Sequence, residues 1–567
     1  MSLDRGDKIL VTSLGALALV SAAFLGYFLL GGRGDGAPGE TVTDARRDGS
    51  RPRGAGSLAR DGSPSSEAAE EETEEAADPA RFAALIEELK AAILAEEVER
   101  ANSIVASNPG LLEAAVPMLV SLLEDPAPSE KSKRLTIEFL KKVPTEEVRA
   151  ALRRALERET LLGVRKALLM ALGELKDVPS IPLVAKLLLD PNELHEIRVL
   201  AADTLGWIGH PDATPALLKM IESLKGSLGT DSEKSLMSHV LQAISLIKDR
   251  AATAPLLALL TDPGSSPWLV WQLVRALGGI GDPAVTQALL AIARAEASDP
   301  AFGKSARLDA IRSLFAVAAA GDAAAAKGII ELFQTMPDET FKKEALHNLA
   351  KLADNGDVLK ELNGVLDTSD QFAYKDLAVR GLAYKGGPDS FDRVLQELRA
   401  SDKYDATDIL KKIGQQYLRA GDEATKKAFA EKLTSSLAAE SDPRLLEGLF
   451  ESIGLTADPV LGEAIVEKVR GMEDGTLREK GYYAIVRSKP SSALPVLEAA
   501  ILDPERDGQE RYGAIDALSW WDNEEGIATL ERLLGSFTAD VDQGYRTAIE
   551  GAIGKARQRI EEKKGRR

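Results

Sequence analysis

Few side chains in this sequence are suited to catalysis or metal binding. The 567 residues include no cysteine and four histidines, which are His195, His210, His239 and His347. Without cysteine there are no disulfides, thiolate nucleophiles or iron–sulfur clusters. His195 is followed by Glu196, but the second histidine of a zinc-protease helix is missing. The sequence therefore predicts no catalytic residue, no cofactor and no metal site, and we expect that the chain is not an enzyme.

Basic side chains offer a binding chemistry instead. Seven of them stand near the middle of the second helix of a predicted helical hairpin, and these are Lys186, Lys219, Lys360, Arg393, Lys432, Lys468 and Arg532. Cations at intervals along one face would suit an acidic or extended protein partner. The alternative is a solvated face of ordinary helix-forming residues. We treat the seven as candidate partner-binding residues.

Two tryptophans are further candidates for partner binding. Trp207 and Trp520 occupy the same position in a repeated phrase, just before its closing apolar residue, where another unit has Gly279. The core therefore does not demand a large side chain there. An exposed tryptophan is a frequent hot spot at protein interfaces. Packing on the neighbouring turn is the alternative for both rings.

The elements that carry these residues are predicted to be helices throughout. From Pro79 onward, apolar residues recur at spacings of three and four, which is typical of one helix face. Turns such as Gly281-Asp282-Pro283 end these helices, because glycine adopts the capping conformation and proline cannot extend the helix. Eleven such turns recur about every 34 residues between positions 177 and 522, as expected for stacked helix pairs.

The repeated phrase V/I-R-x-x-A-x-x-A/T-L-G-x-I/L-G-D-P-x-A resembles the HEAT repeat, in the variant shared with phycobilin lyases. It is clear at residues 164–290 and degenerate but in phase at 300–540. The resemblance implies antiparallel helix pairs stacked into a curved solenoid, whose second helices line the concave face. It also implies an alternative function, a lyase-like or other enzyme with a site on that face. A purely structural envelope protein is the other alternative.

The formal net charge of −19 is unevenly spread. Residues 61–78 hold eight acids and no base, so the remaining chain is only mildly acidic. This balance disfavours nucleic-acid binding, which needs a cationic surface. A hydrophobic content of 44 % is ample for a folded protein.

The N-terminal segment is predicted to be a membrane anchor. Residues 9–30 contain no charged side chain and, as a helix of about 1.5 Å per residue, would span a bilayer core of about 30 Å. A cleaved signal peptide is the alternative. We expect a single-pass protein whose C-terminal part lies on the periplasmic or extracytoplasmic side, with the cytoplasmic side as the alternative.

The combined prediction is an all-α chain with three parts. Residues 1–32 form the transmembrane anchor, 33–78 a disordered linker, and 79–567 an α-solenoid of about thirteen antiparallel helix pairs. The predicted function is that of a non-catalytic, membrane-tethered scaffold that binds protein partners through the solenoid surface.

Overall fold

The structure is a computed structural model, and it describes residues 79–564 apart from 263, 297, 300–301 and 539–541. The described part lies within one compact unit, Ala77–Arg567. The predicted anchor (1–32) and linker (33–78) lie outside the described residues.

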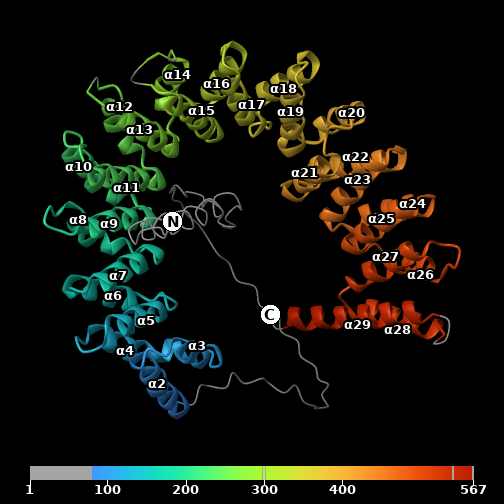
Figure 1. Ribbon diagram of the computed structural model, residues 1–567, viewed down its shortest axis with the longest axis horizontal. Coiled ribbons are helices and arrows are strands. Elements are labelled where there is room, and N and C mark those ends of the chain that lie inside the picture. The colour runs from blue at the N-terminus through green and yellow to red at the C-terminus, as the bar shows by residue number, and fades with distance from the viewer. Residues whose placement is uncertain (1–78, 263, 297, 300–301, 539–541, 565–567) are drawn as a thin grey trace, which may run out of the picture. The chain divides into compact units, whose positions relative to one another are not determined.

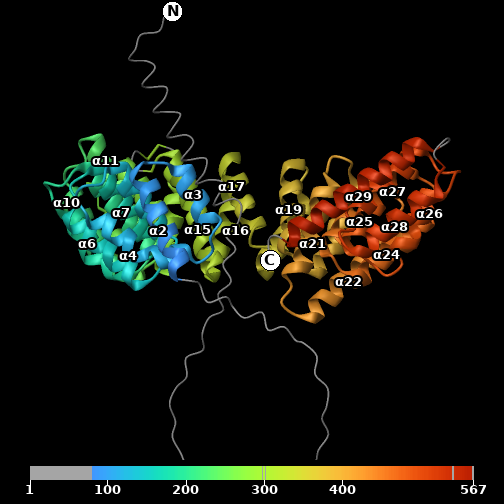
Figure 2. The ribbon, with the colours of Figure 1, turned by 90° about the horizontal axis from the view of Figure 1, so that it is seen from below.

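The predicted all-α solenoid is confirmed, with 28 α-helices in the described residues. The array starts with α2 (Pro79–Leu94), α3 (Val98–Ala106) and α4 (Leu111–Glu124). From there the helices alternate between two layers, which Figure 1 shows on the inner and outer sides of a curved row. Figure 2 shows the same array turned by 90°, so that helices from different parts of the row overlap.

The inner layer consists of α5 (Glu130–Leu140), α7 (Leu162–Glu174), α9 (His195–Ile208), α11 (Asp231–Ile247), α13 (Pro267–Ile280), α15 (Lys304–Ala319), α17 (Glu339–Ala350), α19 (Phe372–Lys385), α21 (Ala406–Arg419), α23 (Pro443–Thr456), α25 (Gly475–Ser488), α27 (Gly508–Ser519) and α29 (Gln543–Lys564). The outer layer consists of α6 (Glu146–Arg158), α8 (Ile181–Leu189), α10 (Thr214–Leu224), α12 (Thr253–Leu260), α14 (Thr286–Arg294), α16 (Ala323–Thr335), α18 (Gly356–Thr368), α20 (Phe391–Ala400), α22 (Glu423–Ala439), α24 (Pro459–Arg470), α26 (Ala493–Leu502) and α28 (Glu524–Ser536).

Each inner helix follows an outer helix in the chain, packs against it in nearly every case, and stacks on the next inner helix. With α2 and α4 as the first pair, the described chain holds the predicted thirteen pairs, and α3 and α29 are additional. One helix pair cannot cover its own apolar stripe, so stacking on both neighbours supplies the core. The core is accordingly continuous, from Leu89 in α2 to Ala556 in α29.

The helix ends follow from local sequence. Gly209 and Gly281 have φ angles of 71° and 72°, so they end α9 and α13 in the left-handed conformation that glycine favours. After the second of these turns, the Asp282 carboxylate accepts a hydrogen bond from the Ala284 N–H at 3.0 Å. A short 3₁₀ turn, Pro283–Val285, then leads into α14. The same order of glycine, polar cap and 3₁₀ turn connects α9 to α10.

Small residues bring the inner helices close together. A Cβ added to Gly206 would lie 2.8 Å from the Cα of Ala243, and one added to Gly278 would lie 2.8 Å from the Cα of Ser313. Consecutive inner helices pack more closely than consecutive outer helices do. The array therefore curves with the inner layer on its concave side. The expectation that the second helices line the concave face is wrong, because the second helix of every pair lies in the outer layer.

The predicted membrane localisation is corrected as well. Among the residues that the structure describes, no helix combines the length and the apolar composition that a membrane crossing requires. The segment on which the prediction depended, residues 9–30, is not among them. A single-pass anchor is therefore not supported, and neither is a location on one side of a membrane.

Candidate functional site

The seven predicted basic residues all lie on outer helices. Lys186 is in α8, Lys219 in α10, Lys360 in α18, Arg393 in α20, Lys432 in α22, Lys468 in α24 and Arg532 in α28. They therefore belong to the convex side of the array. Lys186 and Lys219 are the sixth residues of α8 and α10. The next two outer helices, α12 and α14, have Ala258 and Ala291 at this position, so the row of lysines does not continue along the array.

Four of these seven cations are already engaged within the protein. Arg393 contacts the carboxylates of Asp367 and Glu397, each at 2.9 Å. Lys468 donates to the main-chain oxygen of Glu440 at 2.6 Å. The other two engaged pairs are Lys432–Asp392 and Arg532–Glu498. These four cations serve the fold, so the structure does not present the seven as one continuous basic surface.

Lys186, Lys219 and Lys360 are exposed and have no ion pair or hydrogen bond of their side chains within the described residues. Lys186 lines a cavity of about 780 Å³. Lys186 therefore differs from Lys219 and Lys360, which are not part of the lining of this cavity.

The two tryptophans differ in their environment. Trp207 is half-buried and covers Gly173 of the preceding inner helix, where an added Cβ would lie 2.8 Å from the indole ring. Trp207 therefore packs against a neighbouring helix, which is the alternative that the sequence left open for it. Trp520 is 53 % exposed, and the Arg559 guanidinium of α29 lies 3.7 Å from its ring centre. Trp520 is therefore accessible on one side only.

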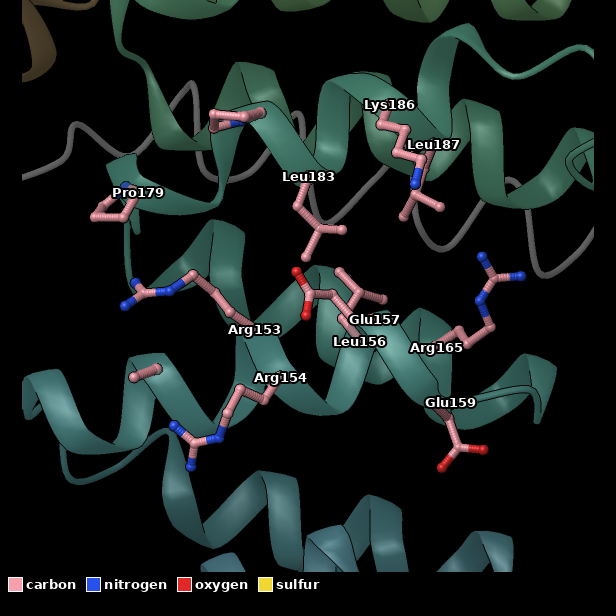
Figure 3. A pocket seen from close by; sticks show the side chains of 12 residues that line it. Arg153, Arg154, Leu156, Glu157, Glu159, Arg165, Pro179, Leu183, Lys186 and Leu187 are labelled. Carbon is pink, nitrogen blue, oxygen red and sulfur yellow. The ribbon is translucent and has the colours of Figure 1, made fainter.

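A groove of about 780 Å³ lies between the outer helices α6 and α8. Its apolar lining comes from Leu156 of α6, from Leu183 and Leu187 of α8, and from Pro179 and Pro182. Figure 3 shows the charged side chains arranged around these leucines, with Lys186 and Arg165 at one end and Arg153 and Arg154 at the other. We call this cavity the α6–α8 groove.

Most of the charges in the α6–α8 groove are held by specific partners. Arg153 donates to Asp177 at 2.6 Å, and Arg154 donates to Glu124 at 2.8 Å. Both Arg165 Nη atoms donate to the Glu193 carboxylate, at 2.9 and 2.5 Å. These hydrogen bonds from Arg165 lower the pKa of Glu193 against the effect of burial. The arginines are thereby fixed in position at the rim of the groove.

A second cavity of about 350 Å³ continues from the first and shares Arg154 and Glu159 with it. It adds Lys133, Arg158 and Glu124 to the lining. The Lys133 Nζ lies 2.8 Å from the Glu159 carboxylate. Burial acts to raise the pKa of Glu159, but hydrogen bonds from Lys133 and the main chain outweigh burial, so the pKa is lowered overall. Arg158 and Glu157 have no side-chain partner among the described residues.

Six cations and three carboxylates line the two cavities. Three further carboxylates, Glu146, Asp177 and Glu193, pair with Arg153 and Arg165, so the unpaired charges of the lining are those of Lys186, Arg158 and Glu157. The sequence analysis identified Lys186 but not the other groove residues. Their contribution follows from the side-by-side placement of α4, α6 and α8, which repeat spacing alone does not reveal. The adjacent arginines Arg153 and Arg154, on the short amphipathic helix α6, were the sequence feature that could have pointed to this groove.

The described residues contain no group of three or more histidine or acidic side chains positioned to hold a metal ion. The α6–α8 groove is wide and open and is lined by leucine, proline and fixed cations. This arrangement suits an extended polypeptide with acidic and apolar side chains.

Comparison with protein families identifies HEAT repeats in residues 116–194, 163–228 and 221–303. The match supports HEAT repeats in general, and the lyase-type variant is not shown. No curated protein matches the chain.

Solved structures of other helical-repeat proteins are similar to this chain. A Kap121p variant has 12 % identity and a TM-score of 0.36, over 84 % of this chain and 56 % of its own length. Kap95p with RanGDP has 12 % identity and a TM-score of 0.38, over 84 % of this chain and 66 % of its own. Human deoxyhypusine hydroxylase has 16 % identity and a TM-score of 0.21, over 67 % of this chain and 97 % of its own. None of these identities is high enough to transfer an activity or a partner.

Proposed function

We propose that this HEAT-repeat solenoid is a non-catalytic scaffold, which binds an extended, acidic segment of a partner protein in the α6–α8 groove. The observation that carries the proposal is the composition of that groove, in which the unpaired cations Lys186 and Arg158 lie beside an apolar lining. Opposite charge favours encounter with an acidic partner, and the half-buried Leu183 and Leu187 favour an apolar anchor.

The fixed arginines make the groove a preformed site. Arg153, Arg154 and Arg165 are held by carboxylates on neighbouring turns, so they lose little side-chain freedom when a partner binds. Lys186 has no such partner and is free to contact the ligand. Glu157 lies among these cations without a partner, and it would repel an acidic ligand.

The proposal is tested with a fluorescein-labelled peptide, acetyl-Glu-Glu-Leu-Glu-Glu-amide, and with its glutamine counterpart. Fluorescence polarisation with the full chain should show saturable binding of the glutamate peptide and much weaker binding of the glutamine peptide. Lys186→Glu should weaken binding by about fivefold or more, which corresponds to about 1 kcal/mol. Mass spectrometry should recover the peptide unchanged, as a scaffold requires.

Lys219→Glu is the matched control, because Lys219 holds the same position in the next outer helix and is also exposed and unpaired. Its peptide affinity should equal that of the wild type. An equal loss in both variants would reveal non-specific attraction and overturn the proposal. Failure of the glutamate peptide to bind the wild-type chain would overturn it as well.

A further inference from the structure

The seams between consecutive inner helices are closed by polar contacts, with one exception. From α5 to α29, each other seam has at least one side-chain hydrogen bond or ion pair between the two helices or the residues at their ends. On the two sides of the exception, Asp203 pairs with His239 at 2.7 Å and Trp271 donates to Asp309 at 2.7 Å. No such contact joins α11 to α13, both of which are described in full.

The α11–α13 seam instead encloses a small pocket of about 170 Å³. Its polar lining residues are Ser238, Gln242 and Ser245 of α11 and Gln272 and Arg275 of α13. None of the five has a side-chain hydrogen bond or ion pair within the described residues. The pocket therefore concentrates hydrogen-bonding groups that the fold leaves unused.

The chemistry of these five side chains selects a type of ligand. Arg275 is the one charged residue of the lining, and its five N–H groups suit a carboxylate. The two glutamines provide both donors and acceptors, which suit the N–H and C=O groups of an extended main chain. Leu241 and Ala276 complete the lining, so the site also has an apolar surface.

Arg275 is positioned for this role by its neighbours. Its guanidinium carbon lies 5.5 Å from the centre of the Trp271 ring, which is itself held by the hydrogen bond to Asp309. Asp309 in turn contacts Arg312 at 2.7 Å. The Asp309 carboxylate is thus already engaged, and Arg275 lines the pocket without an ion pair among the described residues.

We propose that the α11–α13 seam is a second binding site, which takes a glutamate or aspartate side chain and the adjoining main chain of an extended protein segment. This inference adds to the proposed scaffold function, because the seam lies in the inner layer and the α6–α8 groove lies in the outer layer. Two sites on opposite layers let one solenoid hold two segments at the same time.

The test uses the full chain labelled with 5-fluorotryptophan, whose five tryptophans give separate fluorine signals. The Trp271 signal is assigned with Trp271→Phe. Acetyl-Gly-Glu-Gly-amide should shift the Trp271 signal saturably, whereas acetyl-Gly-Gln-Gly-amide should not. Arg275→Gln should weaken this response by about tenfold or more, as expected for loss of a charge-assisted, bidentate contact.

Arg419→Gln is the matched control, because Arg419 is an exposed inner-layer arginine above an aromatic ring, at 5.1 Å from Tyr384. It should leave the Trp271 response unchanged. Lys186→Glu should also leave it unchanged, so the failure of one site is distinguishable from the failure of the other. Acetate is the third probe, and an affinity equal to that of the glutamate peptide would reveal a simple anion site and overturn the proposal. Absence of any Trp271 shift would overturn it too.

Discussion

Glycines of the inner layer determine how closely neighbouring helices approach. Gly206, Gly278 and Gly381 each face the main chain of an adjacent helix at distances that exclude a side chain. The closest main-chain atom to an added Cβ is 2.7 Å away at Gly381. These positions explain why the repeated phrase has glycine or alanine where a globular core would use larger residues. The low aromatic content of 5 % follows from the same packing.

Gly278→Ala is expected to destabilise the protein by about 2 kcal/mol or more, because the new methyl group meets the Cα of Ser313 and cannot be accommodated without moving α15. Gly364→Ala is the matched control, since Gly364 lies in α18 with open space around it. It should stabilise by up to about 1 kcal/mol through helix propensity. Urea unfolding followed by circular dichroism measures both, and equal effects would contradict the packing argument.

A buried carboxylate provides a second residue-scale prediction. Glu510 is 2 % exposed and accepts hydrogen bonds from Arg478, Tyr482 and Arg506. Burial alone would raise the pKa of Glu510, but these hydrogen bonds lower it from 4.5 to about 2. The group therefore contributes stability that is fully present above pH 4.5 and is lost as the pH falls towards 2, on the order of 3 kcal/mol.

Glu510→Gln should accordingly flatten the dependence of stability on pH between about 4.5 and 2. At pH 7 the variant should be less stable than the wild type, because Arg478 and Arg506 lose their buried counter-ion. Thermal unfolding at a series of pH values measures both effects. An unchanged pH profile in the variant would show that Glu510 is not the group responsible.

At the scale of the elements, an arginine at the start of an inner helix has a structural role in three of the helix pairs. In these pairs the fourth residue of the inner helix is an arginine that donates to a main-chain oxygen at the end of the preceding outer helix. The three hydrogen bonds are Arg198 to Leu188 at 3.1 Å, Arg511 to Ile501 at 2.9 Å and Arg546 to Leu534 at 3.0 Å. A cation is favourable there because the last carbonyls of a helix carry partial negative charge. These arginines connect one helix pair to the next and are not available to partners.

Arg198→Met should cost about 1–2 kcal/mol, because it removes a charged hydrogen bond to the last turn of α8 while keeping the apolar stem. Hydrogen exchange should show faster exchange in α8 and α9 than in distant helices. Lys219→Met, at an exposed and unpaired position, should change stability by less than about 0.5 kcal/mol. A similar loss in both variants would rule out the capping role of Arg198.

At the scale of the whole array, each helix pair is stabilised by its contacts with the neighbouring pairs. The last helix, α29, covers α27 through Lys555–Asp516 at 3.0 Å and the Arg559 hydrogen bond to the Ser519 oxygen at 2.6 Å. Tyr545 stacks on Tyr512 at 4.7 Å. The face of α29 that does not pack on α27 and α28 is exposed and polar.

Deletion of residues 543–567 should therefore expose the apolar face of α27 and accelerate hydrogen exchange in α27 and α28. Exchange in α7 to α13 should stay unchanged, since contacts in a repeat array extend only to neighbouring units. Mass spectrometry of peptic fragments measures both regions in one experiment. Faster exchange throughout the array would mean that it unfolds as a single cooperative unit.

The amino-acid sequence by itself determined that the chain is helical and that helix pairs repeat, because apolar spacing and Gly-Asp-Pro turns are local signals. It also identified Lys186, although it grouped that residue with four cations that are engaged within the fold. The layer to which each helix belongs depends on how closely neighbouring pairs approach, which Gly206 and Gly278 decide against Ala243 and Ser313. Only the tertiary structure therefore placed the second helices on the convex side. It alone brought α6 beside α8 and left Arg275 without an ion pair among the described residues, because both depend on residues distant in sequence.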